Sequence, residues 1–176
     1  MTRTELAKKI YDAAYLKGEF LLRSGKISNE YFDKYQFESS PLLLKSIAKE
    51  FIPIIKKLDF DYLAALEMGG IPIATAISLE INKDVVFVRK KAKEYGTQKF
   101  AEGPNILGKK LLIVEDVITS GGQVILSKNQ LQSTGAIIND VICVIDRESG
   151  GKELLIENNL NLYPLFTMTE LKKLII

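Results

Sequence analysis

Short apolar runs alternate with helical segments along most of the chain from residue 61 onward. The runs are DYLAALE, DVVFVRK, KKLLIVED and NDVICVIDR, and the segments with helical spacing are IPIATAISLEI and GGQVILSKNQLQSTG. Runs rich in Val, Ile and Leu that are bounded by turn residues and separated by helices are typical of a mostly parallel sheet. The pattern predicts an α/β fold with helices on both faces and right-handed crossovers.

The N-terminal segment has a different pattern, which predicts an amphipathic helix. Leu6, Ile10 and Ala13 recur at helical spacing, so one face of this helix is apolar. Gly18 is expected to stop the helix after Lys17, because glycine is the commonest residue just beyond a helix end.

A second helix is expected to begin after Ser40, whose side chain can cap it. Pro41 follows in the first turn, where its missing N–H costs little, and Pro53 is expected to limit or kink the helix. The chain has 176 residues, which favours one domain. We therefore expect a single domain over residues 1–176, with an N-terminal helical cap or hood over about 1–60 and the α/β core over 61–176.

Composition narrows the classes of protein. The chain is 47% hydrophobic and 26% charged, with a formal net charge of +2, which gives no indication of a nucleic-acid partner. The N-terminus lacks an apolar core of signal-peptide length and the apolar runs are too short to span a membrane, so we expect a cytoplasmic protein without a membrane partner.

Cys143 lies in the apolar run VICVI and is expected to pack in the core. There is no histidine, which excludes the commonest general base and metal ligand.

One connection interrupts the alternation of strands and helices. The segment KKAKEYGTQKFAEGPNILGK joins two predicted strands and has dense charge without apolar periodicity. Connections of about twenty residues inside a compact domain are uncommon, and they are often lids or binding loops. A disordered insertion is the alternative.

The segment LLIVEDVITSGG ends an apolar strand in polar residues, at the edge of the sheet where ligands of α/β proteins bind. Thr119 to Gly122 can form a tight turn whose N–H groups converge on an anion, and the next helix adds its positive end. The segment contains neither GxxxxGK[ST] nor GxGxxG, so a Walker loop and a dinucleotide fingerprint lose support. A phosphomonoester fits such a turn.

Glu115 and Asp116 lie three to four residues before this turn, next to the expected phosphate. Phosphate repels carboxylates, but carboxylates accept hydrogen bonds from vicinal hydroxyls. The pair therefore favours a ribose that carries the phosphate at its 5 position. The alternative for the pair taken alone is a helix-capping or solvated turn.

The whole segment resembles the phosphoribosyl pyrophosphate (PRPP) signature of the type I phosphoribosyltransferases. The resemblance implies that family's fold, a mostly parallel central sheet flanked by helices with an N-terminal hood. It also implies that PRPP is bound by Glu115, Asp116, Val117, Ile118, Thr119, Ser120, Gly121, Gly122 and Gln123.

A second segment, RKKAKEYGT, resembles the mobile catalytic loop of the orotate phosphoribosyltransferases, R-K-x-x-K-x-(H or Y)-G. The matching residues are Arg89, Lys90, Lys93, Tyr95 and Gly96. Cations stabilise the charge that develops on a departing diphosphate, so the resemblance implies that Arg89, Lys90, Lys93 and Tyr95 bind PRPP. Lys90 and Lys93, together with Asp116, are the expected catalytic residues. Where many relatives have a loop histidine this chain has Tyr95, and an unperturbed tyrosine is a poor acid or base near neutral pH.

Three more segments extend the resemblance: FLLRSGKISNEYFD, LEMGGIPIATAIS and VIDRESGG. The second is similar to the family's diphosphate turn. In the third, Arg147 matches the arginine that contacts the orotate carboxylate, and a guanidinium suits a carboxylate bidentately. An ion pair of Arg147 with Asp146 or Glu148 is the alternative. Orotate-binding residues implied by the family are Thr119 and Arg147, with weaker support for Arg23, Tyr31 and Phe32.

The resemblance implies an enzyme of pyrimidine nucleotide (UMP) synthesis that converts orotate and PRPP to orotidine 5′-phosphate and diphosphate. Mg²⁺ is expected to be bound mainly by substrate oxygens and water, and no residue is assigned as a metal ligand. The family also implies a homodimer in which the mobile loop of one subunit completes the site of the other. The alternatives are a transferase for another base, a PRPP-sensing nucleic-acid-binding regulator, and one half of a bifunctional protein that also decarboxylates the product.

Overall fold

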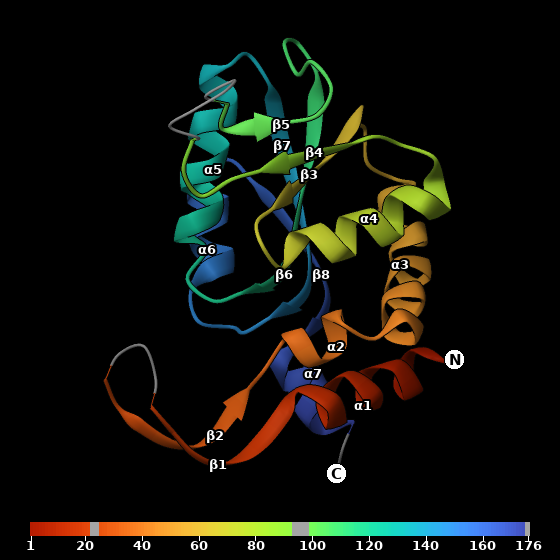
Figure 1. The fold of residues 1–176 in the computed structure, drawn as a ribbon, viewed down its shortest axis with the longest axis vertical. Coiled ribbons are helices and arrows are strands. Elements are labelled where there is room, and N and C mark those ends of the chain that lie inside the picture. The colour runs from red at the N-terminus through yellow and green to blue at the C-terminus, as the bar shows by residue number, and fades with distance from the viewer. Residues whose placement is uncertain (22–24, 93–98, 175–176) are drawn as a thin grey trace.

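A mostly parallel sheet forms the centre of the structure, a computed structural model that describes residues 1–21, 25–92 and 99–174 (Figure 1). Six strands of the described part are hydrogen-bonded in the order β5-β4-β3-β6-β7-β8, and only the β4–β5 pair is antiparallel. The predicted α/β fold is confirmed. In sheet order the strands are β5 (Ala101–Glu102), β4 (Val85–Val88), β3 (Tyr62–Leu66), β6 (Lys110–Ile118), β7 (Ile137–Asp146) and β8 (Asn161–Thr167).

The strand order reverses between β3 and β6. β3 comes first in the chain, β4 adds on one side of it, and β6, β7 and β8 add in turn on the other. A reversal of this kind opens a crevice beyond the carboxyl ends of the two strands, where open α/β sheets bind ligands. The segments that follow β3 and β6 are therefore placed together.

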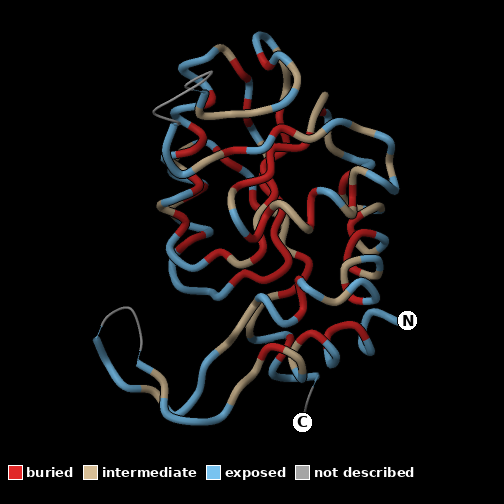
Figure 2. Tube along the Cα trace, in the orientation of Figure 1, coloured by how far each residue is buried: buried red, intermediate tan, exposed pale blue. Residues whose placement is uncertain are grey.

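Helices cover both faces of the sheet, as the sequence predicts. α3 (Pro41–Ile55) and α4 (Gly70–Ile81) lie on one face, and α5 (Gly122–Ser133) and α6 (Gly151–Glu157) on the other (Figure 1). Successive residues of β3 alternate between two cores: Leu63 packs with the α3 and α4 face, and Ala64 with the α5 and α6 face. Figure 2 shows the buried positions concentrated along these central strands. Both faces are apolar, as expected of strands covered on both sides.

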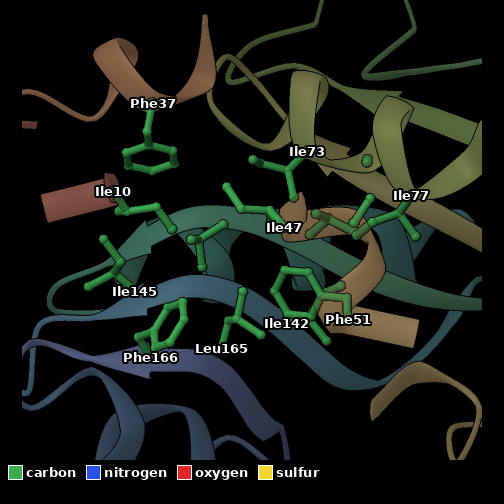
Figure 3. Packing of buried hydrophobic residues seen from close by; sticks show 14 of the residues in the cluster. Ile10, Phe37, Ile47, Phe51, Ile73, Ile77, Ile142, Ile145, Leu165 and Phe166 are labelled. Carbon is green, nitrogen blue, oxygen red and sulfur yellow. The ribbon is translucent and has the colours of Figure 1, made fainter. Parts of the chain in front are cut away.

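The larger core joins the sheet to the N-terminal helices. Ile47 and Phe51 of α3 and Ile73 of α4 are fully buried against Ile142 and other apolar residues of the sheet (Figure 3). Cys143 is fully buried in the other core, which confirms its expected packing role. Burial also raises the pKa of this thiol well above its usual value.

α3 begins and ends close to where the sequence predicts. Ser40 Oγ accepts a hydrogen bond from Leu43 N at 3.4 Å, and Pro41 occupies the first turn. Pro53 lies inside the helix, which ends two residues later at Ile55. A proline therefore limits this helix, as expected.

The predicted extent of the first helix is wrong. α1 (Arg3–Ala14) ends at Ala14, and Tyr15–Leu21 forms β1, which pairs antiparallel with β2 (Ile27–Phe32). Tyr15 lies opposite Phe32 in this hairpin and its ring also stacks on Tyr11 at 4.8 Å. Pairing with a distant strand thus outweighs the local helical pattern. The short helix α2 (Tyr35–Glu38) follows the hairpin.

The sequence interpretation also leaves out several elements. They are the two-residue strand β5, helix α6, edge strand β8 and α7 (Met168–Lys173). Pro164 lies within β8, where a proline is tolerated because the strand is at the edge of the sheet. None of the helices in the described ranges is long and apolar enough to cross a membrane.

Candidate active site

The predicted phosphate turn surrounds a cavity at the carboxyl end of β6. The cavity measures about 250 Å³ and is lined by Glu115 and residues 117–124. Gly121 has φ +75°, a left-handed conformation that glycine adopts without strain, and α5 begins at the next residue. The first N–H groups of a helix lack partners within the helix, so this end of α5 can donate to an anion.

A second glycine pair, Gly150 and Gly151, lies at the start of α6, and Gly151 packs against the phosphate turn. A Cβ on Gly151 would lie 2.5 Å from Thr119 O and 2.7 Å from the Ile118 side chain. The start of α6 therefore packs directly on the phosphate turn, and only glycine allows this approach. The sequence interpretation did not assign this role to Gly151, although the GG of VIDRESGG was its visible signal.

The two adjacent carboxylates lie on opposite sides of β6. Successive residues of a strand point to opposite faces, and both Glu115 and Asp116 are within the strand. Glu115 lines the phosphate cavity, whereas Asp116 is fully buried. Asp116 contacts the turn after β3, because a Cβ on Gly69 would lie 1.5 Å from its Oδ2.

The turn between β3 and α4, residues 67–70, is the segment that resembles the diphosphate turn. It packs closely on β6: a Cβ on Gly70 would lie 2.2 Å from Val114 O. The peptide bond between Glu67 and Met68 is cis. Glu67 Oε1 accepts a hydrogen bond from Lys90 N at 2.6 Å. This contact joins the turn to the start of the predicted catalytic loop.

Two further carboxyl groups and one lysine lie near Asp116. Lys34 Nζ forms an ion pair with Asp116 Oδ2. Burial, followed by a hydrogen bond to Asp116, raises the pKa of Glu38 to about 9. Burial, followed by repulsion from Asp116, raises the pKa of Glu115 to about 8. Neither Lys34 nor Glu38 was predicted from the sequence, because nothing in the local pattern of α2 indicates that it contacts β6.

The predicted catalytic loop is described only at its ends. Arg89 N donates to Phe100 O at 2.9 Å, and Arg89 Nε lies 3.8 Å from Glu102 Oε1. Lys90 is exposed. Lys93, Tyr95 and Gly96 lie outside the described residues, so the structure gives no position for them.

A second cavity, of about 220 Å³, brings together three of the five residues expected to bind a base, whereas Thr119 lines the phosphate cavity. Arg147 lines it with Tyr31 and Phe32 of β2. Arg147 N donates to Ile118 O at 2.9 Å, so Arg147 adjoins the strand end that leads into Thr119. Arg23 lies outside the described residues. The other residues that line this cavity are Tyr11, Tyr15, Ser28, Glu30, Met168 and Lys172.

The alternative ion pairs of Arg147 do not form within the described part of the chain. Asp146 Oδ1 instead accepts from Glu148 N at 2.9 Å, and Glu148 Oε2 accepts from Thr169 N at 2.7 Å. The exposed guanidinium is thus available to a ligand. Glu30, on the same cavity, is bonded to the Tyr15 hydroxyl at 2.5 Å, which is the main cause of the rise in the pKa of Tyr15 to about 12.

Comparisons with known proteins agree with this arrangement. A family model described as a phosphoribosyl transferase domain matches residues 35–157. An orotate phosphoribosyltransferase of Nocardioides sp. is 44% identical over 166 residues, which cover 94% of this chain and 92% of the relative. One of Pyrococcus abyssi is 42% identical over 172 residues, covering 96% and 94%.

A solved structure gives the same result at the level of the fold. The orotate phosphoribosyltransferase of Mycobacterium tuberculosis, in complex with Fe(III) dicitrate, superimposes with a TM-score of 0.87 at 27% identity. The match covers 96% of this chain and 98% of that one. The match therefore extends well beyond the residues 35–157 that the family model covers.

Proposed function

The chain belongs to the orotate phosphoribosyltransferases of the phosphoribosyl transferase domain family, and from this premise we propose how its site works. The reaction transfers ribose 5-phosphate from PRPP to orotate and yields orotidine 5′-phosphate and diphosphate in UMP synthesis. One observation carries the proposal: a residue of the phosphate cavity and a residue of the second cavity are hydrogen-bonded. Ile118 O, from the first, accepts from Arg147 N, from the second. A phosphorylated ribose and a carboxylated base can thus be held side by side.

PRPP is held first through its 5-phosphate. Thr119, Ser120 and the N–H groups of residues 121–123 surround the phosphate at the start of α5. Glu115, on the same cavity, accepts hydrogen bonds from the ribose hydroxyls. Asp116 is the second acceptor once the substrate separates it from Lys34.

The diphosphate lies against the turn at residues 67–70 and under the catalytic loop. Arg89, Lys90, Lys93 and Tyr95 supply charge and hydrogen bonds to it, and Lys90 and Lys93 stabilise the negative charge that develops as it leaves. Within one chain, the Glu67 to Lys90 bond fixes the point from which the loop extends.

Orotate lies in the second cavity. Arg147 binds its carboxylate, Thr119 donates a hydrogen bond from the adjoining turn, and Tyr31 and Phe32 pack beside the ring. Arg23 is a weaker candidate for the same cavity. Orotate differs from uracil by its carboxylate, so Arg147 is the expected source of base preference.

The reaction needs little covalent chemistry from the protein. Orotate N1 attacks ribose C1 while the bond from C1 to diphosphate breaks, through a transition state with oxocarbenium character. Asp116 and Glu115 counter the positive charge on the ribose ring, and the loop cations counter the charge on the leaving group.

Mg²⁺ is part of the proposal as an ion that is bound mainly by substrate oxygens and water. Among the described residues no group of three or more Asp, Glu, His or Cys side chains is arranged to hold a metal. Mg²⁺ supplies charge neutralisation to the diphosphate of PRPP. We assign it no protein ligand. A cytoplasmic location belongs to the same proposal.

The proposal includes one domain over residues 1–176, with a hood over about 1–60, and a homodimer with shared sites. Lys90, Lys93 and Tyr95 then act on the PRPP of the partner subunit. Mixing a Lys93→Ala protein with an Asp116→Asn protein should restore part of the activity, because some hybrid dimers contain one intact site. The check is an assay of verified heterodimers, and no recovery in them would contradict shared sites.

Base choice tests the proposal directly. The protein is incubated with Mg²⁺, PRPP and orotate, uracil or adenine, and product formation is followed together with the loss of orotate absorbance. Turnover with orotate alone is expected. Turnover with only adenine or uracil would favour a transferase for another base, and PRPP binding without any turnover would favour a PRPP-sensing regulator.

A further inference from the structure

The ion pair between Lys34 and Asp116 joins the N-terminal hood to the signature strand. Lys34 Nζ contacts Asp116 Oδ2, and the Asp116 carboxylate is buried while 34% of the Lys34 side chain is exposed. The ammonium therefore reaches Asp116 from the rim of the site and keeps contact with solvent. A buried carboxylate needs such a partner, so neutralising Asp116 is the simplest role for Lys34.

The hood places Lys34 firmly. Phe37 of α2 is fully buried in the larger core. Asp33 accepts hydrogen bonds from Tyr35 N at 3.2 Å and from Gln36 Nε2 at 2.9 Å, which holds the start of the helix. The backbone of Lys34 is thus fixed, while its long side chain can change partner at the rim.

The same carboxylate oxygen places Lys34 at the diphosphate turn. Asp116 Oδ2, which Lys34 contacts, is also the atom that a Cβ on Gly69 would approach to 1.5 Å. The ammonium and Gly69 are therefore neighbours of one oxygen atom. Nζ therefore has to move only from Oδ2 toward Gly69 to reach the turn where the diphosphate is proposed to lie.

The charges around this point favour such a movement. Asp116 contacts Gly69 of the turn to which Glu67 belongs, and a substrate with several negative charges must be accepted there. Glu38 also faces Asp116, but its pKa of about 9 keeps it protonated near neutral pH. Burial lowers the pKa of Lys34, but attraction and a hydrogen bond to Asp116, together with the attraction of Glu38 and Glu115, outweigh burial and the net shift is upward. Lys34 is therefore a charged ammonium that can pair with the substrate.

We propose that Lys34 is a further PRPP-binding residue. In the free enzyme Lys34 neutralises Asp116. When PRPP binds, the ribose hydroxyls take the place of the Lys34 ammonium at Asp116, and the ammonium pairs with the diphosphate. The inference rests on the proposed function in so far as PRPP is the ligand. It predicts that Lys34 distinguishes PRPP from ribose 5-phosphate, which has the same ribose and phosphate but no diphosphate.

The test is calorimetric titration of the whole protein with PRPP and with ribose 5-phosphate. Lys34→Met should weaken PRPP binding by about 10- to 100-fold, the range for a lost charge-assisted contact, and ribose 5-phosphate by less than about threefold. Lys34→Arg should recover most of the PRPP affinity. Lys8→Met, which removes an exposed lysine paired with Asp12 on α1, is the control and should change neither affinity.

A purely structural Lys34 gives a different result, because it would weaken both ligands equally. An Asp116→Asn background removes the charge that Lys34 neutralises and guards against misfolding of the single variant. Adding Lys34→Met there should still lower PRPP affinity about tenfold, and no further loss would overturn the inference. These titrations need no turnover, so they stand apart from the assay of the base: wild-type protein that binds PRPP but does not use orotate contradicts the proposed function alone.

Discussion

The phosphate cavity and the Arg147 cavity are built in opposite ways. Glu115 and the contiguous residues 117–124 line the first, which lies at the start of α5, where backbone N–H groups lack partners within the helix. The second is lined by side chains that lie as far apart in the chain as Tyr11 and Lys172. A backbone site depends on glycines and on helix geometry, whereas a side-chain site depends on how the hood docks on the sheet. The phosphate cavity can therefore be predicted from a short sequence motif, whereas the Arg147 cavity cannot.

The comparison predicts that the two cavities can be damaged separately, and Arg147 should give the largest effect. Arg147→Ala should lower kcat/KM for orotate by about 100-fold, because an ionic, bidentate contact is lost. Calorimetry should find PRPP binding nearly unchanged. Lys172→Met is the control on the same cavity, and an equal loss for both ligands in Arg147→Ala would show that the cavities are not independent.

Gly151 tests the cavity that the backbone forms. Gly151→Ala places a methyl group 2.5 Å from Thr119 O, so the phosphate turn must shift and affinity for ribose 5-phosphate should fall about tenfold, at a stability cost of about 1–3 kcal/mol. Gly150→Ala is a matched control: its Cβ meets nothing within 4 Å, although φ is +84°. That variant should lose about 1–2 kcal/mol of stability and keep its phosphate affinity. Equal affinity losses in both variants would contradict a specific role for Gly151.

The contact between Glu115 and the ribose hydroxyls should make kcat/KM for PRPP change several-fold with pH. Burial raises the pKa of Glu115 to about 8, so the carboxyl group is mostly protonated at pH 7 and mostly ionised at pH 9. Because the ribose hydroxyls need an ionised acceptor, kcat/KM for PRPP should rise through pH 8. Glu115→Gln should flatten this rise, and a profile that keeps its shape in the variant would assign the titration to another group.

Glu38 should have the smallest effect on activity and a measurable one on stability. Its pKa is about 9 in the folded protein against an ordinary 4.5, so above pH 4.5 the unfolded chain ionises while the folded one keeps its proton. Stability from this group therefore falls as pH rises from about 4.5 to about 9. Glu38→Gln removes that loss, and urea denaturation should find it more stable than wild type by about 1–3 kcal/mol at pH 9 and little changed at pH 4.5. A gain that is the same at both pH values would mean that Glu38 is not protonated in the fold.

The helices, strands and turns that depend on residues close together in the chain could be predicted from the sequence. The core strands β3, β4, β6 and β7 follow from apolar runs, and the start of α3 follows from Ser40 and Pro41. The phosphate turn follows from a single motif. Each depends on neighbours in the chain, so periodicity and turn chemistry are sufficient to indicate it.

What was missed depends on contacts between distant residues. Tyr15 continues a helical pattern, yet it pairs with Phe32 in the hairpin. The sequence analysis gives Lys34 and Glu38 no role, and only the docking of α2 and its preceding residue beside β6 brings them to Asp116. Likewise, the separation of Glu115 from Asp116 follows once β6 is known to continue to Ile118.

Pro164 in β8 has a consequence for self-association. β8 is one edge of the six-stranded sheet in the described residues, and at the other edge β5 has only two residues. A proline removes a backbone donor from one edge, and the other edge is too short to template a partner strand. Both borders are thus poor acceptors for an additional strand, so the fold discourages edge-to-edge polymerisation of the sheet.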